Sequence, residues 1–245
     1  MKLTPYRKVA AAANDSWNIG MSQEEIETLS VDELDKNCDA RGSMMAAIDK
    51  IAEILHLTDD QKERFAKCVF ADDHAEIDEW DKIVYADIQK RWEKEVGENP
   101  RVVLDVLAAV HDYWVTDKAR KFGQEGRENK RYQHLPIEMI GWKETKSDLL
   151  FVSPILEAIG VNVNEEVLEA YYDKRVGRFF AENGLNGQEE LENYILNIAD
   201  HYAPISDINN PKNTEKPEEI ANQMADQVVT RLPLPLKEKV ETENK

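Results

Sequence analysis

The chain has 245 residues, of which 42% are hydrophobic and 33% are charged, a composition typical of a folded globular protein rather than a disordered one. Its formal net charge at pH 7 is -18, so its average field repels phosphate groups and disfavours nucleic acid as a partner. No apolar run approaches the roughly 18 residues of a membrane-spanning helix, and the first residues lack the apolar core of a secretory signal. These features predict a cytoplasmic protein with no membrane association.

The sequence contains two cysteines, Cys38 and Cys68. Each lies on the apolar stripe of a predicted helix, where a free thiol packs as a small hydrophobic side chain. Two isolated cysteines do not make a disulfide framework. We therefore expect two buried thiols in a reducing compartment.

Helix-start signals occur repeatedly from the N-terminus onward. Thr4-Pro5 opens a first, alanine-rich helix that is expected to close near Gly20. Three capping boxes follow, in which an N-cap hydroxyl and the side chain three residues later satisfy each other's backbone N–H groups. The boxes are formed by Ser22 with Glu25, Ser30 with Glu33, and Thr58 with Gln61.

Apolar residues at helical spacing predict buried helix faces. One predicted face consists of Met44, Ile48, Ile51 and Leu55, and a second consists of Ile77, Trp80, Val84, Ile88 and Trp92. The segment 101–122 is the most apolar of the chain and is predicted to be the central helix. Burial of both tryptophans on the second face is expected.

Further helices are predicted after Pro136, from Asn164 to about Asn183, and around Leu191 to Tyr202. The chain shows no alternating strand pattern, phosphate-binding loop or internal repeat. The predicted fold is all-α, a multi-helix globular bundle with a mobile C-terminal tail. Residues 1–203 are expected to form a single helical domain with a weak subdivision near 160–164, and residues 204–245 a polar linker, a short helix and an extended charged tail.

One arrangement of polar residues suggests metal chemistry. His111-Asp112 follows an apolar run, His74 precedes it and Asp148 comes after it. This order is similar to the ligand order of metal-dependent phosphohydrolases of the HD type, which would act on a nucleotide or phosphoester through a divalent metal. The other interpretation places His111 at the edge of the core beside Trp114, with Asp112 pointing to solvent. Outside the hydrolase hypothesis no cofactor can be assigned.

A basic segment reverses the sign of this acidic chain. Its basic residues are Lys118, Arg120, Lys121, Arg127, Lys130 and Arg131. Guanidinium and ammonium groups at this density could bind a phosphate or the acidic surface of a partner. The alternative is a solvated loop that pairs with acidic residues elsewhere in the chain.

No nucleophile elbow or catalytic triad is recognisable in the sequence, and 49 acidic residues make carboxylate pairs uninformative. An acidic helical protein can instead present a charged face to a basic partner. The sequence therefore predicts a protein-interaction or regulatory module that binds a protein partner, with the HD-like phosphohydrolase as the alternative. Whether the chain is an enzyme, its oligomeric state and the identity of its partner stay open.

Overall fold

The computed structural model describes residues 4–72, 76–115, 135–198 and 217–242. Regular structure in these ranges is helical throughout and includes no strand, which confirms the predicted all-α fold. Backbone contacts divide the chain into two compact units. The first consists of Met1–Val110 and Ser147–Glu165, and the second of His111–Lys146 and Glu166–Lys245.

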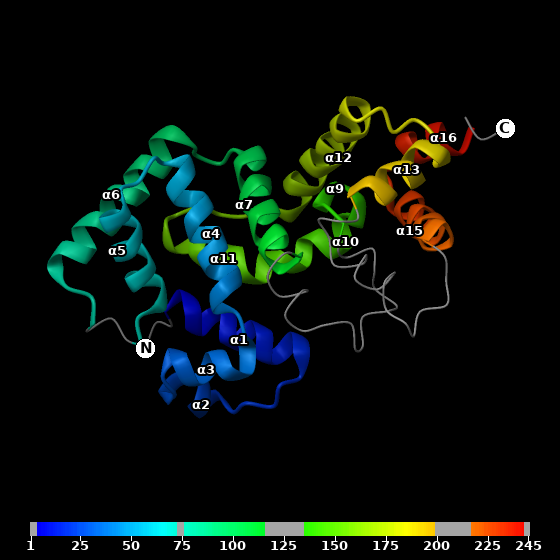
Figure 1. Cartoon of the computed structure of the whole chain (residues 1–245). Helices are drawn as coiled ribbons and strands as arrows, with labels where there is room; N and C mark the ends of the chain where they lie inside the picture. The colour runs from blue at the N-terminus through cyan, green and yellow to red at the C-terminus, as the bar shows by residue number, and fades with distance from the viewer. Residues whose placement is uncertain (1–3, 73–75, 116–134, 199–216, 243–245) are drawn as a thin grey trace. The chain divides into compact units, whose positions relative to one another are not determined.

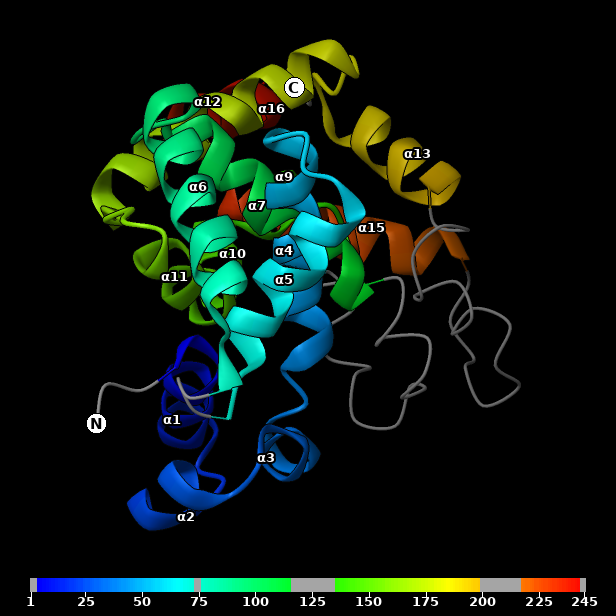
Figure 2. The same cartoon turned by 90° about the vertical axis from the view of Figure 1, so that its left-hand side faces the viewer.

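The first unit is built from seven consecutive helices and one later helix in the described ranges. They are α1 (Pro5–Trp17), α2 (Gln23–Thr28), α3 (Val31–Cys38), α4 (Arg41–Ile54), α5 (Asp59–Phe70), α6 (Glu79–Glu95), α7 (Pro100–Tyr113, whose last turn belongs to the second unit) and α11 (Leu149–Ala158). Figures 1 and 2 show α5 and α6 side by side, with α4 packed against α5. The helix α11 packs against both α1 and α4.

All three predicted capping boxes are present in the structure, at the starts of α2, α3 and α5. A fourth box, which the sequence analysis did not identify, opens α6. There the Asp78 side chain accepts a hydrogen bond from the backbone of Asp81, and the Asp81 side chain accepts one from the backbone of Asp78. Two aspartates thus perform the reciprocal capping usually associated with a hydroxyl and a glutamate.

Two buried polar side chains of α1 connect it to its neighbours. The Tyr6 hydroxyl donates to Asp35 over 2.5 Å. Arg7, which is buried, donates to the backbone carbonyl oxygens of Ile26 at 2.6 Å and Asp72 at 2.9 Å. Hydrogen bonds from a buried guanidinium are charge-assisted and short. These directional bonds, together with apolar packing, therefore hold α1 in its orientation against the elements around it.

The predicted core faces are confirmed except at Trp80 and at Ile77, which is half-buried and precedes α6. Met44, Ile48, Ile51 and Leu55 of the α4 region are fully buried, as are Ile88 and Trp92 on α6. Trp80 is 53% exposed, so the prediction that both tryptophans are buried was wrong. Residues four positions apart differ by about 40° around the helix axis, so a long i, i+4 series drifts gradually around the helix. Trp80, at one end of the series, therefore lies beyond the edge of the buried face that contains Val84, Ile88 and Trp92.

The predicted central helix is present as α7, and its apolar residues Val103, Leu107 and Val110 are buried. The α-helix ends at Tyr113, earlier than the predicted end at Phe122. Residues 116–122 lie outside the described residues.

In the described ranges, the second unit has two single-turn helices followed by four longer ones. They are α9 (Ile137–Ile140), α10 (Trp142–Thr145), α12 (Glu165–Glu182, whose first residue belongs to the first unit), α13 (Gln188–Ile198), α15 (Pro217–Arg231) and α16 (Leu234–Thr242). Figure 1 shows α13 and α15 side by side, in agreement with their extensive contact. The Tyr172 hydroxyl of α12 donates to the Ile137 carbonyl oxygen at 2.5 Å, which fixes α9 against α12.

Most of the extended charged tail predicted for the end of the segment 204–245 is instead the helix α16, and its residue Val240 is buried. Pro235 stands in the first turn of α16, where a missing backbone N–H removes no intrahelical hydrogen bond. The prolines of this segment therefore begin a helix rather than prevent one. The other parts of the predicted linker and tail, residues 204–216 and 243–245, lie outside the described residues.

Gly141 separates α9 from α10 in a conformation that only glycine adopts readily. Its φ is +83° and its ψ is 155°, a region that is strained for any residue with a Cβ atom. A Cβ atom added there would lie 2.9 Å from Cβ of Arg231 on α15. The close approach of these two segments thus requires the absence of a side chain at position 141.

We predict that Gly141→Ala lowers the free energy of unfolding by about 2–3 kcal/mol, because it combines backbone strain with a steric overlap. Gly184→Ala is the matched control, since Gly184 also has a positive φ, +66°, but has open space around the added Cβ. Urea unfolding followed by circular dichroism measures both. Equal destabilisation by the two substitutions would show that the contact with Arg231 has no effect.

Candidate functional site

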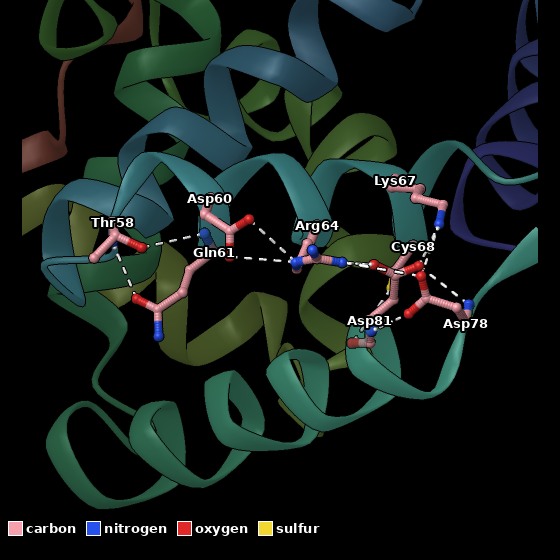
Figure 3. Close-up of polar contacts among 8 residues, drawn as sticks. All are labelled: Thr58, Asp60, Gln61, Arg64, Lys67, Cys68, Asp78 and Asp81. Atoms are coloured by element: carbon pink, nitrogen blue, oxygen red, sulfur yellow. Dashed lines mark hydrogen bonds and ion pairs between the residues drawn. The ribbon is translucent and has the colours of Figure 1, made fainter.

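The Asp81 side chain is the centre of the contact between α5 and α6. It has 0% of its side-chain surface exposed, although it is a carboxylate in the first turn of α6. Arg64 Nη1 on α5 donates to it at 2.8 Å, and Lys67 Nζ, one turn further along α5, donates to its other oxygen. Figure 3 shows the two cationic side chains converging on the carboxylate. The helices α5 and α6 are therefore joined by one buried carboxylate that forms ion pairs with two cationic side chains.

The same carboxylate also belongs to the N-terminal cap of α6. Asp78 N donates to Asp81 Oδ2 at 3.1 Å, and the Cys68 thiol lies 3.9 Å from the Asp81 carbonyl oxygen. The hydrogen bond from Lys67 is the main cause that lowers the pKa of Asp81 from 3.8 to about 2, with further contributions from Asp78 and Arg64. Asp81 is consequently ionised at neutral pH despite its burial.

One side of α6 faces solvent and carries two large apolar side chains. Trp80 is 53% exposed and Ile83 is 56% exposed. They are three residues apart and so lie on adjacent turns of one helix face. The exposed carboxylates of Glu79 and Asp87 lie four residues before and after Ile83, so they border the apolar pair on the same helix. We call these four residues the α6 outer face.

A different side of α6 lines a cavity of about 380 Å³ within the first unit. Its walls come from α1, α5, α6, α11 and Ile77, which precedes α6. Among the lining residues, the Gln89 side chain donates to the Ala158 carbonyl oxygen at 2.7 Å. We call this cavity the α6 cavity. Its lining residues are Pro5, Lys8, Cys68, Ile77, Lys82, Tyr85, Gln89, Pro154, Glu157 and Ala158.

The two cysteines are free and buried, as predicted. Burial raises the pKa of both thiols to about 11. At neutral pH they are therefore protonated, and the thiolate that a nucleophilic cysteine needs is scarce. Cys68 contributes an uncharged wall to the α6 cavity.

The structure places His111 where the non-catalytic interpretation expects it. His111 is 4% exposed, its Nε2 atom is 2.6 Å from the Leu135 carbonyl oxygen, and its ring stacks with that of Trp114 at 6.5 Å. The neighbouring Asp112 is exposed. The protein around Asp112 still removes part of the hydration of its carboxyl and raises its pKa above the ordinary value, while His111 acts in the opposite direction.

The metal hypothesis has two other candidate ligands, Asp148 and His74. Asp148 is buried at the start of α11, in the first unit. His74 lies outside the described residues. Among the described residues, no group of three or more His, Cys, Asp or Glu side chains could hold a metal ion. The four-ligand site stays a prediction.

The basic segment also stays a prediction. All its candidate binding residues fall between positions 116 and 134, outside the described residues. They are Lys118, Arg120, Lys121, Arg127, Lys130 and Arg131.

If the metal hypothesis is correct, protein purified without chelator will contain about one divalent ion per chain by elemental mass spectrometry. Asp112→Ala should remove the ion. This exposed position is a safer substitution than the buried His111, whose loss would also remove the contact with Leu135. Protein that takes up no manganese, iron or zinc on incubation would eliminate the hypothesis.

Comparisons of the chain with protein families, with curated proteins and with solved structures gave no match. Within the described ranges, none of the helices combines the length and the apolar character that crossing a membrane would require. The functional argument therefore depends on the geometry of the first unit. The sequence contained one unused signal for it, the Asp-x-x-Asp spacing of Asp78 and Asp81 ahead of an apolar helix.

We predict that Asp81→Asn lowers the free energy of unfolding at pH 7 by about 2–3 kcal/mol, because it leaves two cations without their shared carboxylate. The control is Asp60→Asn, which removes an exposed carboxylate 3.2 Å from the same Arg64 and should change stability by less than about 0.5 kcal/mol. Urea unfolding compares the two. Similar effects at both positions would contradict a special role for the buried carboxylate.

The stabilisation by Asp81 should depend on pH in a defined window. The pKa of Asp81 in the folded protein is lowered from the ordinary value of 3.8 to about 2. The contribution of Asp81 to stability is therefore complete at pH values above its pKa in the unfolded chain, and it is lost as the pH falls through its pKa in the folded protein. The difference in unfolding free energy between the wild type and Asp81→Asn should be constant above about pH 5 and should shrink toward pH 2. Urea titrations at several pH values measure it.

Proposed function

We propose that this protein is an interaction module that binds a basic, amphipathic helix of a partner protein through the α6 outer face. The exposure of Trp80 beside Ile83 is the observation that carries the proposal. Tryptophan is strongly enriched among the residues that dominate binding energy at protein interfaces. A matching apolar stripe on a partner helix would pack across these two side chains in ordinary helix-to-helix geometry.

The charge around the two apolar side chains favours a basic partner. The exposed carboxylates of Glu79 and Asp87 border the apolar pair, and the chain as a whole carries a net charge of -18. Glu79 pairs with Lys82 at 2.6 Å, but both side chains are largely exposed and such pairs exchange partners at little expense in free energy. Lysine and arginine side chains flanking the partner's apolar stripe would find complementary charge, which speeds association and selects against acidic helices.

A cytoplasmic location accompanies this proposal. It is supported by the two free, buried thiols, since proteins of oxidising compartments usually pair their cysteines.

A synthetic amphipathic helix of leucine and lysine tests the proposal directly. We expect the labelled peptide to bind the full-length chain in a fluorescence anisotropy titration, and Trp80→Ala to weaken binding by about 30-fold, as expected for loss of a central aromatic anchor. Binding should also weaken as salt is raised, because the carboxylates supply part of the attraction.

Two controls make the test specific. Trp17→Ala removes another exposed tryptophan, 49% exposed on α1, and should leave peptide binding unchanged. A peptide in which glutamate replaces lysine should not bind. The proposal fails if Trp80→Ala binds the basic peptide as tightly as the wild type, or if the acidic peptide binds equally well.

A further inference from the structure

We propose that the α6 cavity is a binding site for a small organic carboxylate with an apolar body, such as an aryl-alkanoate. This site is separate from the α6 outer face and does not depend on the proposed protein interaction. Its volume of about 380 Å³ falls within the range of roughly 300–1,000 Å³ found for small-molecule pockets.

The apolar part of such a ligand matches the walls of the cavity. Pro5 and Pro154 are rigid, Ile77 and Ala158 are apolar, and the ring of Tyr85 adds an aromatic surface. Tyr85 is itself held in place, because its ring packs against that of Phe65 with centroids 5.9 Å apart. A preformed apolar wall of this kind contributes affinity without ordering flexible side chains on binding.

The charged groups favour an anion. Lys8 and Lys82 line the cavity, against the single carboxylate of Glu157, so the lining is positive within an otherwise acidic chain. Lys8 and Glu157 form an ion pair of 2.8 Å in which both side chains are partly exposed. Lys82 forms a similar exposed pair with Glu79 at 2.6 Å. Exposed pairs of this type stabilise a protein little, so both ammonium groups can turn from their present partners to a ligand carboxylate.

Two further polar groups fit a carboxylate or its substituents. The Tyr85 hydroxyl has no hydrogen-bond partner among the described residues, and burial raises the pKa of this phenol, so at neutral pH it is a proton donor. The Cys68 thiol is also protonated and repels no anion. A half-buried donor without a partner is a group that a ligand oxygen can satisfy.

The experiment compares two probes of the same shape and opposite charge, 4-phenylbutyrate and 4-phenylbutylamine. Saturation-transfer NMR with the full-length chain should detect the carboxylate, and titration should give it at least a tenfold lower Kd than the amine. Lys82→Glu should weaken phenylbutyrate binding by about tenfold or more, and Tyr85→Phe by about fivefold.

Lys90→Glu is the matched control, because it makes the same charge change at an exposed position of α6 that does not line the cavity. It should alter the Kd by less than about twofold. Trp80→Ala should have no effect on phenylbutyrate, which separates this proposal from the protein interaction. Circular dichroism confirms that each variant is folded.

Three results would overturn the proposal. They are no detectable binding of phenylbutyrate at millimolar concentration, equal binding of the amine, and equal weakening by Lys82→Glu and Lys90→Glu. The last result would mean that the field of the whole chain, rather than the cavity, attracts the anion.

Discussion

The buried carboxylate of Asp81 determines the orientation of α6, and with it both surfaces to which we assign a function. An ionised group is taken out of water only where charged and hydrogen-bonding partners compensate for the lost hydration. Arg64 and Lys67 supply that compensation from two successive turns of α5, and Asp78 adds a backbone N–H. Because hydrogen bonds are directional, this arrangement sets the rotation of α6 about its own axis. Apolar packing by Val84, Ile88 and Trp92 alone would fix that rotation less strictly.

The rotation of α6 then decides which residues meet solvent. With Asp81 turned toward α5, Trp80 and Ile83 face outward, while Lys82 and Tyr85 border the cavity. An exposed tryptophan is thus a consequence of satisfying a buried charge on the same turn of helix. The same element can present an apolar stripe to a partner and enclose a small molecule, since the two surfaces use different sides of one helix.

Much of this fold could be predicted from local sequence. The capping boxes at Ser22, Ser30 and Thr58 were identifiable because they depend on residues three positions apart. The burial of Met44, Ile48 and Ile51 followed from helical spacing. The helix α16 was not predicted, because the prolines near its start also fit an extended chain, and packing that buries Val240 decides between the two.

The candidate site was less accessible to sequence reasoning. The Asp-x-x-Asp spacing marks Asp81 as a capping residue, but nothing in the sequence shows that it is buried, since its burial depends on where α5 places Arg64 and Lys67. Trp80 continues the i, i+4 spacing of apolar residues along α6. Only the packing of the helix shows that Trp80 is exposed while the residues that follow it in this series are buried. The α6 cavity combines residues from α1, α5, α6 and α11, a set that no local pattern connects.

Hydrogen–deuterium exchange of the α6 amides is the most direct test of the role of Asp81. In the wild type the second and third turns of α6 should be protected at pH 7, since the first backbone N–H groups of a helix have no intrahelical acceptor. Asp81→Asn should speed exchange there and in the facing turns of α5, while peptides from α13 and α15 in the second unit keep their protection. Unchanged protection of α6 in Asp81→Asn would contradict the account, because it would show that apolar packing alone holds this helix in place.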